Sequence, residues 1–449
     1  MHSTISQPEP ATARLDSEAT EVGSVFVSNY PPYSFWSEDQ SSAALDALAR
    51  EPEQGTPMGL YVHIPFCRKR CKFCYFRVFT DKNSTQIHDY LDAVVREVEL
   101  YSRQTAVAGR ALRFVYFGGG TPSYISADQL RTLVEGIQRY LPWDQAEEVA
   151  FECEPGTLTQ TKLEAIRGIG VTRLSLGIES FDDDVLRENG RAHVSTEIHR
   201  IRPWIRALDF DQLNIDLIAG MVGETLETWQ ESVRRTIEYD PDSVTIYQME
   251  LPFNTVYSRG LLDGTSEVQF ANWSEKRAWH AWAIAELEAV GFERWSAYVM
   301  LKPRGDKKPN FVYADSLWHG SDMIGAGVSS FSQVNGVHFQ NADRWGDYLQ
   351  RIQAGGLAIA RAFVTSPSER LTRELILQMK TGRVSRAYFS EKFGVDIREA
   401  YSEPLGTLEA QGMLHTDDNE VRMTDAGILR VDQLLPEFYA EKYRDARYT

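Results

Sequence analysis

The feature of this sequence that most limits its fold is a regular alternation, from Gly59 onward, of short apolar runs with longer amphipathic segments. Six runs have the length and composition of strands, and the segments between them have the apolar spacing of helices. These runs are LYVHI, LRFVYF, EVAFECEP, RLSLGIE, LNIDLIAG and SVTIYQMEL. Strands that alternate with helices form parallel βαβ units with right-handed crossovers. The sequence therefore predicts an α/β fold with a full or partial parallel (β/α) barrel.

The 449 residues exceed what one hydrophobic core usually supports, so we expect a large domain with a smaller companion. Residues 1–22 are polar and show no apolar period, which predicts a disordered tail. Residues 23–58 form an aromatic, proline-rich arm that we expect to pack against the rest of the chain. Residues 59–365 hold the predicted barrel domain and its C-terminal extension.

Residues 366–449 form a separate, mainly helical pattern of three helices, a short hairpin and a final helix. This order is typical of a winged-helix-like domain. Several acidic residues and the lack of a basic recognition face favour a packing or substrate-covering role over DNA binding.

The net charge and the apolar stretches of the sequence indicate which partners and which cellular location to expect. The chain has 47 Lys and Arg residues against 64 Asp and Glu residues, a formal net charge of −17. Such an acidic excess argues against a nucleic-acid partner. No apolar stretch approaches the roughly 18 residues of a membrane-spanning helix, and the polar N-terminus lacks the pattern of a secretory signal. We therefore expect a cytoplasmic protein without a membrane partner.

Three of the four cysteines lie within eight positions, in the segment HIPFCRKRCKFCYF. Cys67, Cys71 and Cys74 follow the first strand-like run, where loops at the ends of barrel strands build active sites. Thiolates are the ligands of iron–sulfur clusters, and three thiolates leave one iron of a 4Fe-4S cluster open for a small molecule. The spacing therefore predicts a 4Fe-4S site.

Two other interpretations of these cysteines are three buried structural thiols or a zinc site completed by His63. Zinc sites usually combine two C-x-x-C pairs, and the sequence has no second pair, which favours the cluster. The fourth cysteine, Cys153, alternates with the apolar residues of AFECEP and is expected in the core.

The spacing CxxxCxxC is the signature of the radical S-adenosylmethionine (SAM) superfamily, and YVHIPFCRKRCKFC resembles the oxygen-independent coproporphyrinogen III oxidase family. That family also includes heme chaperones and certain radical methyltransferases and cyclopropane-forming enzymes. The resemblance extends from the aromatic arm to the C-terminal domain. It implies that the cluster cleaves SAM to methionine and a 5′-deoxyadenosyl radical, which abstracts a hydrogen atom from its target.

The resemblance also assigns SAM contacts residue by residue. GGGTP, with Gly118, Gly119, Gly120 and Thr121, matches the loop that receives the amino group of SAM. Glycines suit such a loop because the backbone must approach the ligand closely. Carboxylates there can bind the amino group or the ribose hydroxyls, and an arginine can bind the carboxylate of SAM. The other positions carried over are Tyr61, Phe73, Glu152, Glu179, Arg191 and Asp216.

The sequence departs from the family pattern at several places, among them the segment AGMVGET, which lacks the usual proline. Phe76 stands where the oxidases have a further cysteine, which places decarboxylation of a heme precursor in doubt. Glu179 replaces a common glutamine, and the aromatic arm lacks the arginine of the oxidases. An arm of this kind argues against a pure heme chaperone.

The departures lead to a ranked set of functions. The first hypothesis is an enzyme that uses two SAM molecules, one for the radical and one to donate carbon, for C-methylation or cyclopropanation of a small-molecule substrate. The alternatives are an oxygen-independent coproporphyrinogen III oxidase and a heme chaperone. In each enzymatic case the expected partners are the substrate and an electron donor such as flavodoxin or ferredoxin.

Overall fold

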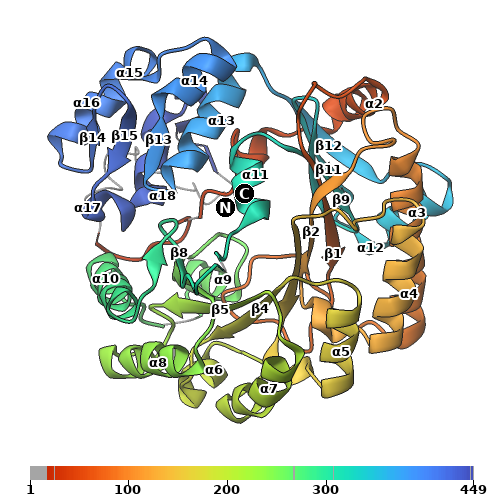
Figure 1. Ribbon diagram of the computed structural model, residues 1–449, viewed down its shortest axis with the longest axis horizontal. Helices are drawn as coiled ribbons and strands as arrows, with labels where there is room; N and C mark the ends of the chain where they lie inside the picture. The colour runs from red at the N-terminus through yellow and green to blue at the C-terminus, as the bar shows by residue number, and fades with distance from the viewer. Residues whose placement is uncertain (1–17, 25, 266–267, 307, 445, 448–449) are drawn as a thin grey trace.

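The computed structural model describes residues 18–447 except 25, 266–267, 307 and 445. Figure 1 shows a curved sheet with helices around its outer side and a second domain facing its open side. The twelve strands of this sheet have the order β12-β11-β10-β9-β1-β2-β3-β4-β5-β6-β8-β7. The sheet ends at β12 and β7, so the barrel is partial.

The six predicted strands are confirmed as neighbours in the centre of this sheet, and all of them are parallel. Their residues are almost all buried, which explains why they read as near-continuous apolar runs. The strands are β1 (Met58–Ile64), β2 (Leu112–Gly119), β3 (Glu148–Cys153), β4 (Arg173–Glu179), β5 (Gln212–Ala219) and β6 (Ser243–Gln248).

The chain beyond β6 extends the sheet at both edges. The strand β9 pairs parallel with β1, and β10 to β12 continue antiparallel from it, while β8 and β7 extend the sheet beyond β6. These strands are β7 (Glu293–Arg294), β8 (Val299–Leu301), β9 (Asp322–Ala326), β10 (Phe331–Val334), β11 (Val337–Asn341) and β12 (Ile359–Val364).

Helices cover the outer face of the sheet, as Figure 1 shows for α3 to α8. Asn83, Ser126 and Thr225 each form a capping box at a helix start, which satisfies backbone N–H groups and fixes where the helix begins. The helices are α2 (Ser41–Ala49), α3 (Ser84–Ser102), α4 (Ala127–Gln138), α5 (Gln160–Gly168), α6 (Asp183–Glu188), α7 (Ser195–Leu208), α8 (Leu226–Tyr239), α9 (Val256–Leu262), α10 (Trp273–Ala289), α11 (Val312–Trp318) and α12 (Trp345–Gln353). No helix in the described part of the chain is long and apolar enough to cross a membrane.

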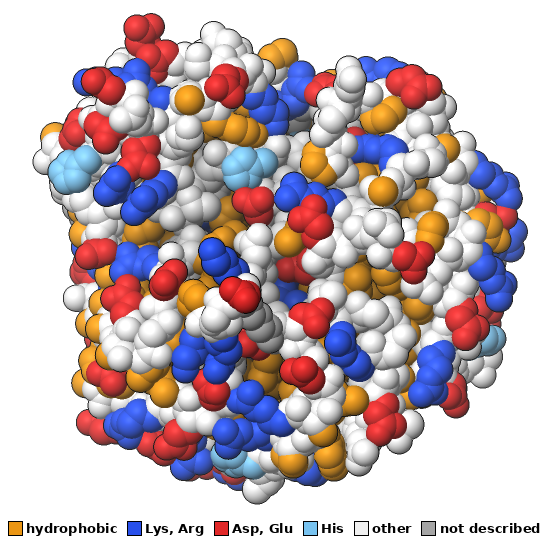
Figure 2. All heavy atoms as spheres, viewed as in Figure 1, with side chains coloured by type: hydrophobic (Ala, Val, Ile, Leu, Met, Phe, Trp, Pro, Cys, Tyr) orange, Lys and Arg blue, Asp and Glu red, His pale blue; other side chains and the backbone are white. Residues whose placement is uncertain are grey.

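The C-terminal domain has the predicted mainly helical, winged-helix-like order. Its three-stranded sheet has the order β13-β15-β14 and is surrounded by short helices. The elements are α13 (Pro367–Met379), β13 (Arg383–Ser385), α14 (Arg386–Phe393), α15 (Ile397–Ala400), α16 (Ser402–Ala410), β14 (Leu414–Thr416), β15 (Glu420–Met423), α17 (Asp425–Ile428), α18 (Val431–Leu434) and α19 (Glu441–Arg444). In Figure 2, acidic and basic side chains are interspersed over the visible face of the molecule.

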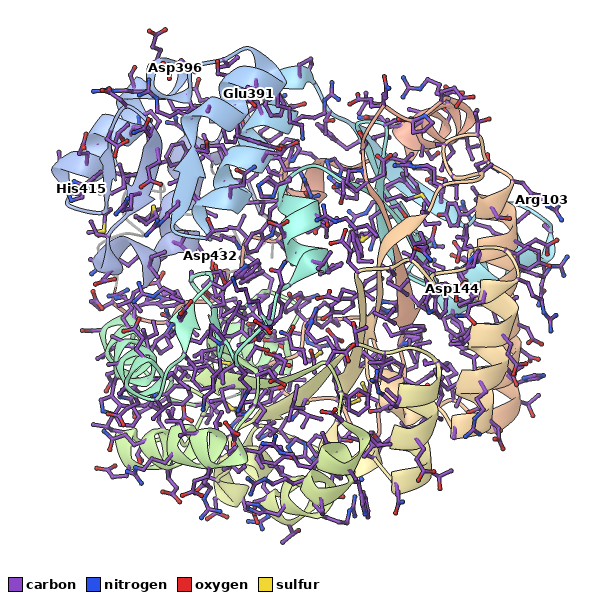
Figure 3. The ribbon with its side chains drawn as sticks, viewed as in Figure 1. Arg103, Asp144, Glu391, Asp396, His415 and Asp432 are labelled. Atoms are coloured by element: carbon purple, nitrogen blue, oxygen red, sulfur yellow. The ribbon has the colours of Figure 1, made fainter. Side chains whose placement is uncertain are left out.

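The aromatic arm packs into the core of the C-terminal domain. Tyr30 is 1% exposed and lies with its ring centroid 4.9 Å from that of Tyr439. The backbone N–H of Val27 donates to Asp432, which Figure 3 places where the C-terminal domain meets the barrel. Farther along, Ser37 bridges to Ala362 of β12. The arm therefore connects the C-terminal domain to the edge of the large sheet.

The prediction of a disordered tail over residues 1–22 is wrong at its C-terminal end. Residues 1–17 lie outside the described residues, but Glu18 forms an ion pair of 2.7 Å with Arg277 of α10. Thr20 donates to the carbonyl of Ala271 at 2.7 Å. The polar composition of residues 18–22 therefore reflects contacts with charged and backbone groups of the barrel domain.

Candidate functional site

The three clustered cysteines lie in the loop after β1 and line a central cavity of about 1390 Å³. The arm, the ends of the parallel strands, α11 and the C-terminal domain also contribute to its wall. Parallel strands direct their carboxyl ends to one mouth of a barrel, so residues far apart in sequence meet there. The arm, the barrel and the C-terminal domain therefore all contribute to the wall of this cavity.

Two of the cysteine sulfurs accept hydrogen bonds. The hydroxyl of Thr121 donates to Cys67 Sγ at 3.3 Å, and Arg191 Nη1 donates to Cys71 Sγ at 3.4 Å. Burial raises the pKa of Cys67 to about 11 and that of Cys74 to about 12. Metal binding replaces such protons, and donors to the sulfurs tune the potential of a bound cluster.

The cysteine geometry fits a cluster better than a single ion. Among the described residues, no three His, Cys, Asp or Glu side chains converge closely enough to hold one metal ion. The zinc interpretation therefore lacks a ligand set, and burial lowers the pKa of His63 to about 4 without bringing it to a shared ion. In a 4Fe-4S cluster each cysteine sulfur binds a different iron, so the three thiols need not converge on one ion.

The cysteine loop is fixed to β3 by an ion pair that the sequence did not reveal. Arg68 Nη2 lies 2.9 Å from Glu154 Oε1, and Arg68 Nε also donates to the same carboxylate at 3.1 Å. His193 Nδ1 lies 3.2 Å from Glu154. Burial alone would raise the pKa of Glu154. The hydrogen bonds from His193 and Arg68 have the larger effect, so the pKa is lowered to about 2. A bidentate pair of this kind fixes orientation as well as position.

The glycine loop after β2 approaches the cysteine loop closely. Gly119 has a φ of +113°, and a Cβ there would lie 2.5 Å from the ring of His63. A Cβ on Gly120 would lie 2.7 Å from the backbone carbonyl carbon of Pro65. Glycine is therefore required by close packing at both positions, independently of any ligand.

Replacing Gly120 by alanine is expected to displace the cysteine loop, because the new methyl group meets backbone atoms that cannot rotate away. Overpacking of this kind typically costs about 1–3 kcal/mol. We expect a lower free energy of unfolding by chemical denaturation and a lower iron content after reconstitution. Gly168→Ala, where a Cβ meets nothing within 4 Å, is the matched control; equal losses in both variants would contradict the explanation.

Three buried carboxylates face the cavity from neighbouring strands: Glu152, Glu179 and Asp216. Burial raises the pKa of Glu152 and Glu179 to about 7 and that of Asp216 to about 6. Mutual repulsion contributes, since Asp216 raises the pKa of both glutamates. A group of carboxylates held in this way is suited to bind a cationic ligand.

Arg191 lies between the carboxylates and the cysteine loop. Its Nη2 is 3.5 Å from Glu179 and donates to the carbonyl of Gly177 at 2.5 Å. Its Nε is buried and has no hydrogen-bond partner among the described residues. A buried guanidinium with one unused donor can bind a carboxylate, so this corner offers an anion contact beside the cation-binding group. Together they fit the carboxylate, ammonium and sulfonium groups of SAM.

The structure brings the sequence-predicted residues together. Tyr61 stacks on Tyr116, whose hydroxyl donates to Glu152 at 2.7 Å, and the Gly119 N–H donates to the same carboxylate. A Cβ on Gly118 would lie 2.9 Å from the hydroxyl of Tyr61. The predicted residues that line the cavity are Tyr61, Cys67, Cys71, Phe73, Cys74, Gly119, Gly120, Thr121, Glu152, Glu179, Arg191 and Asp216. The prediction that Cys153 belongs to the core is also confirmed, since it is 5% exposed.

Other cavity residues were missed because no motif marks them. They include Arg173, which forms a buried ion pair with Glu148, and aromatic side chains such as those of α11. The apolar pattern places Arg173 at the start of a strand, but it does not identify Glu148 as the ion-pair partner of Arg173. Other aromatic residues that line the cavity are Tyr75, Tyr116, Trp295, Phe311, Tyr313 and Trp318.

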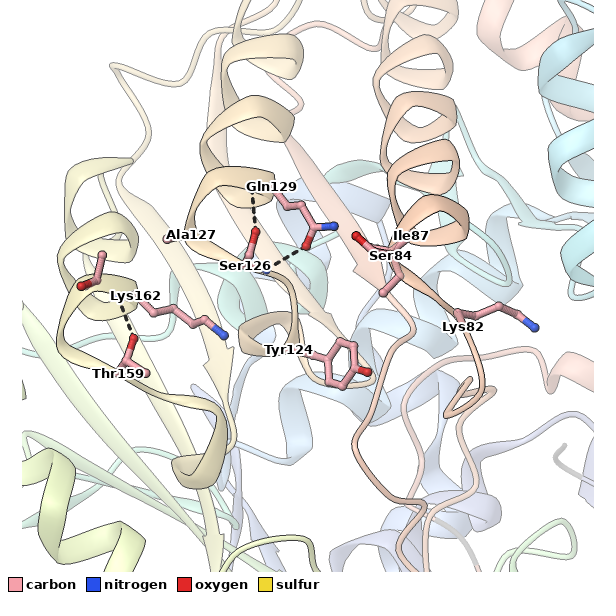
Figure 4. Close-up of a pocket in the computed structure, with 10 residues that line it drawn as sticks. Lys82, Ser84, Ile87, Tyr124, Ser126, Ala127, Gln129, Thr159 and Lys162 are labelled. Atoms are coloured by element: carbon pink, nitrogen blue, oxygen red, sulfur yellow. Dashed lines mark hydrogen bonds between the residues drawn. The ribbon is translucent and has the colours of Figure 1, made fainter.

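A second, open pocket of about 520 Å³ lies between the starts of α3, α4 and α5 (Figure 4). Its polar side chains are already engaged: Ser126 and Gln129 form a capping box, and Lys162 donates to the carbonyl of Ser123 at 2.7 Å. The cysteines do not line it, so we assign the site to the central cavity.

Comparison with known proteins agrees with this geometry. Residues 61–236 match the radical SAM superfamily, and residues 365–430 match the HemN C-terminal domain. A heme chaperone HemW of Bacillus subtilis is 26% identical over 85% of this chain and 99% of its own length. An oxygen-independent coproporphyrinogen III oxidase of Pseudomonas aeruginosa is 26% identical over 89% of this chain and 90% of its own length.

Among solved structures, the coproporphyrinogen III oxidase HemN of Escherichia coli, described as a radical SAM enzyme, is similar with a TM-score of 0.79. The match has 25% identity and covers 92% of this chain and 96% of that protein. The similarity of fold thus extends over most of this chain. The cysteine loop thus lies in the part of the chain that matches the radical SAM superfamily, and the C-terminal domain in the part that matches the HemN C-terminal domain.

Proposed function

We propose that this chain is a radical SAM enzyme that abstracts a hydrogen atom from a large, flat substrate bound in the central cavity. Cys67, Cys71 and Cys74 would hold a 4Fe-4S cluster, and the cluster with SAM supplies a 5′-deoxyadenosyl radical when both are bound. Glu152, Glu179, Asp216 and Arg191 would orient SAM. An electron donor such as flavodoxin or ferredoxin is part of the proposal.

The main support for this proposal is that the three cysteines and a group of aromatic side chains line one cavity of about 1390 Å³. We call the aromatic part of this cavity the chamber. Ligand sites commonly measure roughly 300–1,000 Å³, so this volume leaves room for a substrate beside SAM. Aromatic walls favour flat, largely apolar molecules. The arm and the C-terminal domain cover the chamber, which would keep water from a reactive radical.

The reaction that the relatives support best is oxidative decarboxylation of coproporphyrinogen III. The oxidase of Pseudomonas aeruginosa and that of Escherichia coli match across both domains. These similarities favour the oxidase over the carbon transfer that the sequence hypothesis ranked first.

One observation favours C-methylation or cyclopropanation with a second SAM molecule as a second candidate. Phe76 occupies the position of the additional cysteine of the oxidases and is 46% exposed beside the cluster loop. An aromatic side chain cannot donate hydrogen or ligate iron as a thiol does, so a reaction that requires that cysteine would fail here.

The deciding experiment is anaerobic incubation of reconstituted full-length protein with reductant, methyl-labelled SAM and coproporphyrinogen III. Protoporphyrinogen with unlabelled carbon establishes the oxidase. Labelled carbon in a product establishes carbon transfer. Absence of 5′-deoxyadenosine with every substrate, together with stoichiometric heme binding, would contradict both and indicate a chaperone such as the Bacillus relative.

SAM affinity is expected to depend on pH. Because burial raises the pKa of Glu152 and Glu179 to about 7, both are protonated below that value and ionised above it. SAM carries a net positive charge, so it binds the ionised form more tightly. A group with a pKa near 7 loses about nine-tenths of its charge between pH 8 and pH 6, so the dissociation constant should rise about tenfold. Calorimetric titration at both pH values measures this; a constant affinity would contradict it.

A further inference from the structure

Tyr75 extends from the cysteine loop into the substrate chamber. It directly follows Cys74, lines the central cavity, and lies with its ring centroid 4.5 Å from that of Phe76. Asn254 Nδ2 donates to its backbone carbonyl at 2.8 Å, which fixes where the side chain begins. Its hydroxyl has no hydrogen-bond partner among the described residues. A phenol in this position can donate to, or accept from, a molecule in the chamber.

Glu250 follows the end of β6 and lines the same chamber. Its Oε2 atom is buried and has no hydrogen-bond partner among the described residues. Burial raises the pKa of Glu250, and the positive charge of Lys276 opposes that rise. Buried polar atoms are almost always hydrogen-bonded, so an unused carboxylate oxygen beside a cavity indicates a donor on the ligand.

The two groups line the same cavity. Burial raises the pKa of Tyr75, and the charges of Tyr33, Cys74, Asp432 and Glu250 add to that rise. Figure 3 shows Asp432 at the junction of the barrel and the C-terminal domain. The phenol and the carboxylate thus offer one donor and one acceptor to the same space.

We propose that Tyr75 and Glu250 form a substrate subsite that recognises a hydroxyl or N–H group. The substrate group accepts a hydrogen bond from the Tyr75 hydroxyl and donates one to Glu250 Oε2. An ether or a tertiary amine can satisfy only Tyr75, and a hydrocarbon satisfies neither. The inference deepens the proposed function and rests on it only in treating the cavity as the substrate site.

Three flat probes of similar outline test this subsite in the reconstituted full-length protein, kept anaerobic with saturating SAM and without reductant. Naphthalene can make neither bond, 2-methoxynaphthalene can accept from Tyr75, and 2-naphthol can make both bonds. Calorimetric titration should give affinities that rise in this order. Each hydrogen bond is expected to contribute about 3- to 10-fold.

Two variants test which residue is responsible for each increase in affinity along the probe series. Tyr75→Phe removes only the hydroxyl and should abolish the gain from naphthalene to 2-methoxynaphthalene. Glu250→Gln replaces the charged acceptor by a neutral amide, so it should reduce the gain from 2-methoxynaphthalene to 2-naphthol. Tyr247→Phe is the matched control. Tyr247, near the end of β6, lines the same cavity, but its ring stacks on that of Tyr298. Its probe ratios should equal those of the unmodified protein.

The outcomes separate this inference from the proposed function. Equal probe ratios in the unmodified protein and in Tyr75→Phe would overturn the subsite, even if Glu250→Gln fails to fold because Lys276 loses its partner. Ratios that appear without SAM and vanish with it would also overturn it, because the two groups would then contact SAM. SAM cleavage by added reductant, measured with the unmodified protein in the same preparations, tests the proposed function separately.

Discussion

Cys71→Ala is expected to abolish 4Fe-4S assembly, and with it all reductive cleavage of SAM. The remaining thiols, Cys67 and Cys74, leave two irons of the cluster without protein ligands, and Arg191 loses the sulfur to which it donates. Iron and sulfide analysis, together with absorbance after anaerobic reconstitution, measures the loss. We expect the same result for Cys67→Ala and Cys74→Ala.

The matched control is Cys153→Ala. Cys153 is also a free cysteine that lines the cavity, but it lies in β3 and packs in the core. That variant should keep its iron and its SAM cleavage, with at most a modest loss of stability. A full cluster in Cys71→Ala, or an equal loss of iron in Cys153→Ala, would refute the assignment of the cluster ligands.

Glu148→Ala is expected to lower the free energy of unfolding by about 3–5 kcal/mol. Glu148 and Arg173 are 4% and 3% exposed at their side chains, and their charged atoms lie 3.0 Å apart. Removing the carboxylate leaves a guanidinium buried without compensation. The backbone N–H groups of Val312 and Tyr313, both 3.2 Å from the carboxylate, also lose their acceptor, which would loosen the start of α11.

The neighbouring residue provides the comparison. Glu147 pairs with Arg113 at 3.1 Å, but its side chain is 57% exposed. Exposed pairs are worth about 1 kcal/mol or less, so Glu147→Ala should be nearly neutral. Urea denaturation of both variants measures the difference; equal midpoints would show that the buried pair does not stabilise the fold.

The central part of the fold could be predicted because its signal is local. Strands β1 to β6 are buried on both faces, and the helices between them carry capping residues such as Ser126 and Thr225. The strands β9 to β12 could not be predicted as part of the same sheet. Their pairing with β1 joins segments more than 250 residues apart, and no short-range pattern records such a contact.

The candidate site also has residues that the sequence predicts and residues that only the structure reveals. Spacing alone identified Cys67, Cys71 and Cys74, and the resemblance supplied the SAM contacts. The anchor between Arg68 and Glu154, the buried Arg173 and the chamber position of Tyr75 depend on tertiary contacts of single side chains. A charged or aromatic residue in a sequence does not reveal which distant group it meets. Those residues became visible only in the folded chain.

The shared core of the arm and the C-terminal domain has a consequence for how the molecule matures. Val27 binds Asp432 across 405 positions, so the roof of the chamber forms only after both segments have left the ribosome. At about 5–20 residues per second, synthesis of the intervening chain takes roughly 20–80 seconds. During that interval the cysteine loop, which precedes most of the chain, has no roof over it.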